Sequence, residues 1–146
     1  IRAAAAEGYA RLGEASDVAK LQPAFDDEKK MPARLGIAFA LVALGQRSTE
    51  EFAPLTYLIH TLNSRQYRGV AEPYLLELTR QPEVRLAVYP FVAKSTKDEK
   101  MGLARIFAMT GDREAITQLE WISKDADPEV ASVGLQSLRV LRTRLN

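Results

Sequence analysis

The sequence predicts an all-α fold built from repeated pairs of helices. Its opening segment, IRAAAAEGYARLG, recurs along the chain. When Arg2 is aligned with Arg34, Arg68, Lys100 and Ala131, the small and apolar residues that follow fall into register, at steps of 32, 34, 32 and 31 residues. Apolar residues recur at helical spacing within each copy, and no segment alternates apolar and polar residues for long enough to indicate a strand. Self-similarity at this period is typical of a stacked-repeat architecture.

Turn and cap residues set the expected limits of the helices. Gly13 supplies a helix end in the left-handed conformation, and Ser48 with Glu51 has the spacing of a capping box. Pro73 and Pro90 lie inside expected helices, because the apolar spacing continues through both. The expected helices span residues 1–13 and 17–25 in the first repeat, 31–45 and 50–62 in the second, 66–79 and 82 onward in the third, 99–109 and 113–123 in the fourth, and 129–142 in the fifth.

These helices are expected to form one domain over residues 1–146. Its repeats span about 1–30, 31–64, 65–98 and 99–128, with a half repeat over 129–146. Arrays of this kind normally close with atypical, more polar capping repeats, and neither end of this chain has one. We therefore expect a segment of a longer array.

Composition excludes several classes of function. The chain has 20 Lys and Arg against 19 Asp and Glu, a net charge of +1 that argues against a general polyanion binder. It has no cysteine and one histidine, His60, so it offers neither a Cys–His pair nor a cluster of His and Cys metal ligands. No apolar run approaches the roughly 20 residues that span a bilayer. We expect a soluble, non-enzymatic protein with no cofactor, no metal and no membrane span.

Four segments each carry part of a further pattern. The parts are an apolar residue followed by an arginine and a run of small residues, a Leu-Gly pair at a helix end, and a turn that opens a helix. The segments are Ile1-Arg2-Ala3-Ala4-Ala5, Arg11-Leu12-Gly13, Ala43-Leu44-Gly45 and Asp127-Pro128-Glu129-Val130-Ala131. In these segments the chain resembles the short HEAT-like repeats first recognised in bilin lyases. The resemblance implies an α-solenoid, a right-handed superhelix of about four and a half helical hairpins.

Tetratricopeptide repeats are the rival family. They keep a strict 34-residue period, which three of the four steps here do not, and they place a small residue early in the second helix. This chain has larger side chains at that position, and the HEAT-like resemblance is the better match. The residues concerned are Val18, Phe52, Val84 and Ile116.

The second helices line the concave surface of HEAT arrays, so their outward-facing residues are the candidate binding residues. On a helical wheel that starts at Phe52, the residues Leu55, Leu58 and Ile59 share one apolar face. Tyr57 lies almost diametrically opposite that face. We therefore expect Tyr57 to face solvent.

The position of Tyr57 is aromatic in the next two repeats as well, where it holds Tyr89 and Trp121. Adjacent helices pack about 8–10 Å apart, so the three rings would form a solvent-facing ladder roughly 20 Å long. Exposed aromatic clusters near an arginine are typical of binding hot spots. The alternative is structural: the Pro90 helix rotates after Tyr89, and Trp121 packs on the next repeat. The polar residues near the ladder are Arg85, Gln118 and Lys124.

Two sets of basic residues and one set of acids have structural explanations. The first set, which we call the basic row, recurs once per repeat. Its long side chains cover apolar surface while their charged ends bond to turn acids or helix ends. Cations near the end of the last helix are favourable because they oppose its macrodipole, and the alternative for them is a phosphate-binding role. The acids around Pro128 are expected to form a turn and a helix start. These sets are Arg2, Arg34, Arg68 and Lys100; Arg139, Arg142 and Arg144; and Asp125, Asp127 and Glu129.

The leading functional hypothesis is a protein-interaction module that binds a protein or peptide on its concave face. A nucleic-acid module, similar to HEAT-like DNA glycosylases, is the first alternative; near-neutral charge argues against it, and steep salt dependence would support it. A lyase-like or chaperone-like accessory role is implied by the family resemblance alone.

Overall fold

A computed structural model describes the backbone of residues 2–146 and the side chains of residues 4–10, 13, 14 and 16–146. Every regular element in this part of the chain is helical, and none of its residues forms a strand. The predicted all-α class is therefore confirmed. Backbone contacts divide the chain into two compact units, one ending at Leu78 and the other running from Thr79 to Asn146. None of the described helices combines the length and the apolar character needed to cross a membrane.

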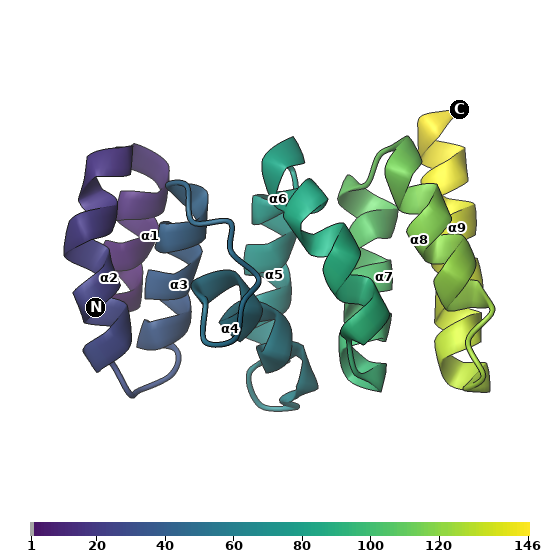
Figure 1. Cartoon of the computed structure of the whole chain (residues 1–146), viewed down its shortest axis with the longest axis horizontal. Coiled ribbons are helices and arrows are strands. Elements are labelled where there is room, and N and C mark those ends of the chain that lie inside the picture. The colour runs from purple at the N-terminus through teal and green to yellow at the C-terminus, as the bar shows by residue number, and fades with distance from the viewer. Residues whose placement is uncertain (1) are drawn as a thin grey trace. The chain divides into compact units, whose positions relative to one another are not determined.

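The first unit is built around one largely apolar helix, α3, whose single charged residue is Arg34 near its start. This helix packs against α1, α2, α4 and α5 (Figure 1), and all eight residues over 35–42 are buried. The stretch over 35–42 is apolar on every side and is stable only when other elements surround it, which explains the central place of α3. The elements are α1 (Arg2–Leu12), η1 (Ala15–Asp17), α2 (Val18–Asp27), α3 (Ala33–Ala43), α4 (Pro54–His60), η2 (Thr61–Asn63) and α5 (Arg68–Leu78).

The second unit has its core between α7, α8 and α9. Helix α9 packs along both α7 and α8, and the side chains of Phe107, Leu119 and Leu141 are completely buried. Gly134 of α9 allows the close approach, since a Cβ there would lie 2.7 Å from the Ser123 nitrogen. The elements are α6 (Pro82–Val88), η3 (Tyr89–Lys94), α7 (Lys97–Thr110), α8 (Arg113–Ser123) and α9 (Pro128–Leu145).

The helix expected over residues 50–62 begins later than predicted. Helix α4 starts at Pro54, and Ser48 accepts a hydrogen bond from the Glu50 amide in a turn instead of capping a helix. Ala53 is extended, with φ −69° and ψ 150°, because the ring of a proline disfavours the helical conformation in the residue before it. The capping box predicted for Ser48 and Glu51 is therefore wrong, and Pro54 was the stronger signal.

The two helix-ending glycines behave differently from one another. Among the described glycines, only Gly45 has a positive φ, of 133°, so the left-handed conformation predicted for Gly13 is wrong. Gly13 is required for another reason. Its amide donates to the Tyr9 carbonyl at 2.7 Å, and a Cβ at this position would lie only 2.4 Å from that oxygen. The glycine thus provides space for the chain to leave the helix.

Pro73 and Pro90, both expected inside helices, have different effects. Helix α5 continues through Pro73, as expected. Helix α6 ends at Val88, and the chain continues as the tighter helix η3, whose second residue is Pro90. Proline has no amide hydrogen, so it cannot make the bond to the carbonyl four residues earlier that an α-helix needs. The tighter helix begins at one of the predicted site residues, Tyr89.

Candidate functional site

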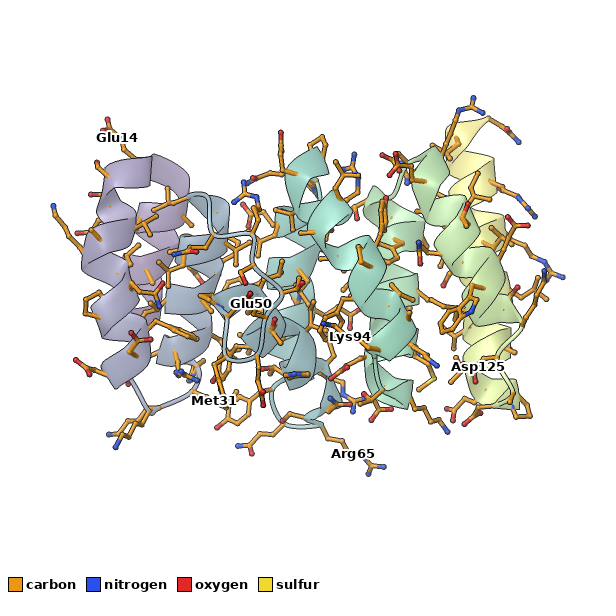
Figure 2. The ribbon with its side chains drawn as sticks, viewed as in Figure 1. Glu14, Met31, Glu50, Arg65, Lys94 and Asp125 are labelled. Atoms are coloured by element: carbon orange, nitrogen blue, oxygen red, sulfur yellow. The ribbon has the colours of Figure 1, made fainter. Side chains whose placement is uncertain are left out.

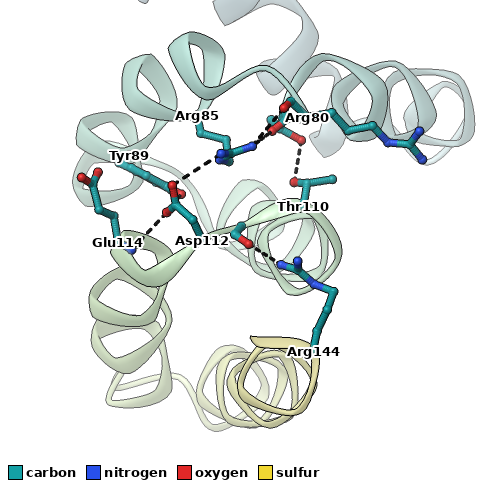
Figure 3. Close-up of polar contacts among 9 residues, drawn as sticks. Arg80, Arg85, Tyr89, Thr110, Asp112, Glu114 and Arg144 are labelled. Atoms are coloured by element: carbon teal, nitrogen blue, oxygen red, sulfur yellow. Dashed lines mark hydrogen bonds and ion pairs between the residues drawn. The ribbon is translucent and has the colours of Figure 1, made fainter. Parts of the chain in front are cut away.

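Two of the predicted site residues, Arg85 and Tyr89, converge on Asp112 at the start of α8 (Figure 3). The Tyr89 hydroxyl donates to Asp112 Oδ1 at 2.9 Å, and Arg85 Nη2 lies 3.4 Å from Asp112 Oδ2. Arg85 Nη1 also donates to the carbonyls of Thr79 and Arg80, at 2.8 and 3.1 Å. Asp112 itself is the N-cap of α8 and accepts a hydrogen bond from the Glu114 amide at 3.0 Å. These contacts tie α6 and η3 to α8.

The charges in this cluster stabilise one protonation state of each group. Burial, followed by the hydrogen bond to Asp112, raises the pKa of Tyr89 from 10.0 to about 12. Partial burial acts to raise the pKa of Asp112, but the hydrogen bonds from Tyr89 and the Glu114 amide and the charge of Arg85 outweigh it and lower that pKa. The phenol is thus a neutral donor and the carboxylate an anionic acceptor at neutral pH.

The predicted solvent exposure of Tyr89 is wrong. Only 6% of the residue is exposed, and its ring packs edge-on against Phe107 with centroids 5.1 Å apart. Two features that a wheel of one helix does not contain explain the difference: the change to η3 at this residue, and an acceptor supplied by α8. Arg85 is also largely covered, with 12% of its side chain exposed. Both residues hold helices together in this structure.

The predicted exposure of Trp121 is confirmed. The residue, on α8, is 46% exposed, and its indole N–H donates to no described residue. Lys100 Nζ lies 4.9 Å from the ring centroid and is held at 2.9 Å by Asp125. Asp125 lies in the segment between α8 and α9 (Figure 2). Of the two polar neighbours that the sequence indicated, Lys124 is exposed and Gln118 is half-buried.

Tyr57, the first residue of the predicted ladder, belongs to the first unit and is half-buried. It is less exposed than predicted because two side chains pack against its ring. The Phe25 ring meets it edge-on at 5.5 Å, and the Arg34 guanidinium lies 4.5 Å from its centroid. Because Tyr89 is buried, the predicted solvent-facing ladder of three rings is wrong.

The basic row has the structural contacts that the sequence predicted. Arg34 Nε donates to the Phe25 carbonyl at 3.0 Å, and Arg68 Nε donates to the Ser64 carbonyl at 3.3 Å. Lys100 bonds to a turn acid, Asp125, which lies 25 residues later in the sequence. The side chain of Arg2 lies outside the described residues. The prediction is confirmed for the three members that the structure describes.

The acids around Pro128 form the predicted turn and helix start. Asp127 caps α9 by accepting the Glu129 amide at 2.9 Å, and the Asp127 amide donates to Asp125 at the same distance. A hydrogen bond from Lys97 is the main cause that lowers the pKa of Asp127. This cluster therefore begins a helix and pairs with a lysine of α7.

The three arginines near the end of α9 have separate environments. Arg144 donates to the carbonyls of Ala108, at 3.2 Å, and of Gly111, and so satisfies the end of α7. Arg142 lies 3.7 Å from Glu120 in an exposed ion pair. Arg139 is exposed.

Sequence reasoning missed one exposed aromatic residue, Phe52. It was aligned with buried positions of the second helices, yet it lies before α4, is 83% exposed and has a φ of 69°. Phe52 lines a pocket of about 140 Å³ together with Arg34, Glu51, Tyr57 and His60. The sequence signal that could have separated Phe52 from the helix is Pro54, two residues later.

Comparison of the chain with protein-family models, with curated proteins and with solved structures finds no match. Within the part of the chain that the structure describes, no three or more His, Asp or Glu residues gather in a way that could hold a metal ion.

Proposed function

We propose that this chain is a protein-interaction module, a HEAT-like α-solenoid that binds a partner protein on its concave face. The single observation that carries the proposal is Trp121. A half-exposed tryptophan with an unused N–H on a well-packed helix offers a partner both apolar area and a hydrogen-bond donor. Tryptophan is also among the residues most enriched in interface hot spots.

The surroundings of Trp121 support this role. Lys100 lies over its ring, and Asp125 fixes Lys100, so the aromatic surface is held in one orientation before any partner arrives. A side chain that is already ordered loses less conformational entropy on binding. Lys124, exposed at the end of α8, adds a positive charge at the edge of this surface. Such a surface suits a partner with an apolar anchor and an acidic rim.

Tyr89 and Arg85 are assigned a structural role and not a direct role in binding. Tyr89 and Arg85 orient α8 through Asp112, and Tyr89 is not offered as an anchor because its ring is covered. Among the residues that the structure describes, no contact favours the nucleic-acid alternative or the lyase-like or chaperone-like accessory role over protein binding.

A paired pull-down tests the proposal. The baits are the wild-type chain, Trp121→Ala and the control Leu135→Ala, whose residue has a similar exposed fraction on α9. Each bait is first shown by circular dichroism to be equally helical. We expect proteins retained by the wild type and the control to be lost from Trp121→Ala, by about thirtyfold in affinity for a hot spot. Equal recovery with all three baits would contradict the proposed role of Trp121.

A further inference from the structure

The pocket beside Phe52 has the features of a small, pre-formed binding site in the first unit. Its lining combines a cation, Arg34, an anion, Glu51, and two aromatic rings, those of Phe52 and Tyr57, with His60 beside them. Its volume of about 140 Å³ suits one terminal group of a ligand and not a large cofactor. The pocket is formed by α3, α4 and the loop between them, all within one compact unit.

Arg34 is held rigidly, yet part of its guanidinium is unused. The Nε donates to the Phe25 carbonyl, and the guanidinium carbon lies 4.0 Å from the Phe25 ring centroid and 4.5 Å from that of Tyr57. Neither terminal nitrogen makes a hydrogen bond or ion pair with any described residue. An arginine fixed in this way presents a planar pair of donors, the geometry that matches a carboxylate.

Phe52 is unusual both in conformation and in exposure. A φ of 69° is costly for a residue with a bulky side chain, and the ring is nevertheless left 83% exposed. Glu51, next to it, is exposed and has no partner among the described residues. Strain of this kind clusters at ligand-binding sites, where the surrounding structure maintains it. The loop therefore presents an apolar ring and a free acceptor next to Arg34.

We propose that this pocket binds the C-terminal residue of a partner peptide. The terminal carboxylate pairs with the free nitrogens of Arg34, and the last side chain lies against Phe52 and the accessible part of Tyr57. The last backbone N–H donates to Glu51. A peptide C-terminus carries these three groups, one anion, one apolar side chain and one donor, on adjacent atoms. A phosphate, by contrast, would bring two negative charges towards Glu51 with no donor to satisfy it.

This site is separate from the Trp121 surface, so each proposal can fail alone. Trp121 belongs to the second unit, and every residue of the pocket belongs to the first. Loss of binding in the Trp121 pull-down says nothing about Arg34, and the peptide experiment below does not depend on Trp121.

The test uses isotope-labelled whole chain and three short probes followed by NMR. The probes are acetyl-Gly-Ala-Ala-Leu with a free carboxylate, the same peptide as its carboxamide, and an amidated peptide with an internal aspartate. We expect the free acid to shift the Arg34 Nε–H and the amides of 51 and 52, with a dissociation constant of about 1 mM or lower. The two amidated probes should bind at least about tenfold more weakly, because they lack the terminal charge-assisted pair.

Variants identify the residues responsible. Arg34→Lys keeps the charge but removes the planar fork, and should weaken binding of the free acid about tenfold. The matched control is Arg68→Lys, at the equivalent repeat position, where both Nε and Nη2 already bond to carbonyls; it should leave binding unchanged. Phe52→Ala, which removes an exposed ring, should weaken binding without loss of helicity. No binding of the free acid, equal binding of the carboxamide or the internal aspartate probe, or unchanged binding in Arg34→Lys would overturn the proposal.

Discussion

Several arginines of this protein act at the ends of helices other than their own. Arg34 of α3 donates to a carbonyl in the last turn of α2, and Arg144 of α9 donates to carbonyls at the end of α7. The last carbonyls of a helix have no partner within it and carry a partial negative charge, so a guanidinium satisfies both needs. A sequence shows that these arginines recur, but it does not show which carbonyl each one reaches.

Tyr89 gives a pH-dependent prediction at the residue scale. Its pKa is raised to about 12 in the folded chain, against about 10 when unfolded, so the stabilisation is complete below pH 10 and is lost as the pH rises from 10 to 12. We expect Tyr89→Phe to lower the free energy of unfolding by roughly 1–2 kcal/mol at pH 8, because Asp112 loses a donor. The difference from wild type should shrink near pH 12.

Urea denaturation at several pH values measures this effect. Tyr67→Phe is the matched control, because the Tyr67 hydroxyl bonds to no described residue. The control should follow the wild-type pH dependence. A constant difference between Tyr89→Phe and wild type from pH 8 to 12 would show that the phenol does not titrate with a raised pKa.

At the scale of elements, two segments with the spacing of a capping box have different outcomes. Thr96 and Glu99 form a capping box at α7, where the Thr96 amide donates to Glu99 at 3.0 Å. Ser48 and Glu51 have the same spacing but start no helix, because Pro54 imposes an extended residue before it. Helix limits could therefore be predicted where local signals agree, as in α8, whose bounds match the expected 113–123.

In the candidate site, the sequence predicts the exposure of a side chain correctly where exposure depends on its own helix, and wrongly where it depends on a neighbouring helix. The exposure of Trp121 depends on the face of its own helix, which the periodicity of that helix predicts. The burial of Tyr89 depends on Asp112, contributed by a different helix, and one wheel contains no information about a neighbour. The pocket at Phe52 depends on a loop conformation for which no local pattern was present.

Gly134 provides a test of helix packing. Alanine is favoured over glycine inside a helix by about 1 kcal/mol, yet a Cβ at Gly134 would lie 2.7–2.8 Å from backbone atoms at the end of α8. Overpacking against backbone typically costs about 1–3 kcal/mol, so Gly134→Ala should reduce the free energy of unfolding. Gly69→Ala in α5, where a Cβ meets nothing within 4 Å, should raise it by about 0.5 kcal/mol.

Thermal or urea unfolding of the two alanine variants measures the change in the free energy of unfolding that each one causes. The two changes are chemically identical, and they differ only in what surrounds the new methyl group. Opposite signs are expected. A stabilised Gly134→Ala would mean that α8 and α9 are not packed as closely as described.

At the scale of the whole molecule, charge separates the two leading classes of function. The chain has a net charge of +1, and several cations are already paired with acids: Lys97 with Asp127 and Glu129, and Lys100 with Asp125. Nucleic-acid affinity comes chiefly from lysines and arginines that neutralise phosphates and release counterions. Cations that are engaged within the molecule are poorly placed to supply it.

We therefore predict no measurable binding of a short DNA duplex by fluorescence anisotropy, up to about 100 μM protein at about 50 mM salt, a condition that favours even non-specific binding. The double variant Arg139→Glu/Arg142→Glu, which removes the local basic excess at the end of α9, should behave like the wild type. Binding that weakens steeply as salt rises would instead favour the nucleic-acid alternative. Loss of that binding in the double variant would place the phosphate contacts on α9, where Arg139 is exposed and Arg142 makes only an exposed ion pair with Glu120.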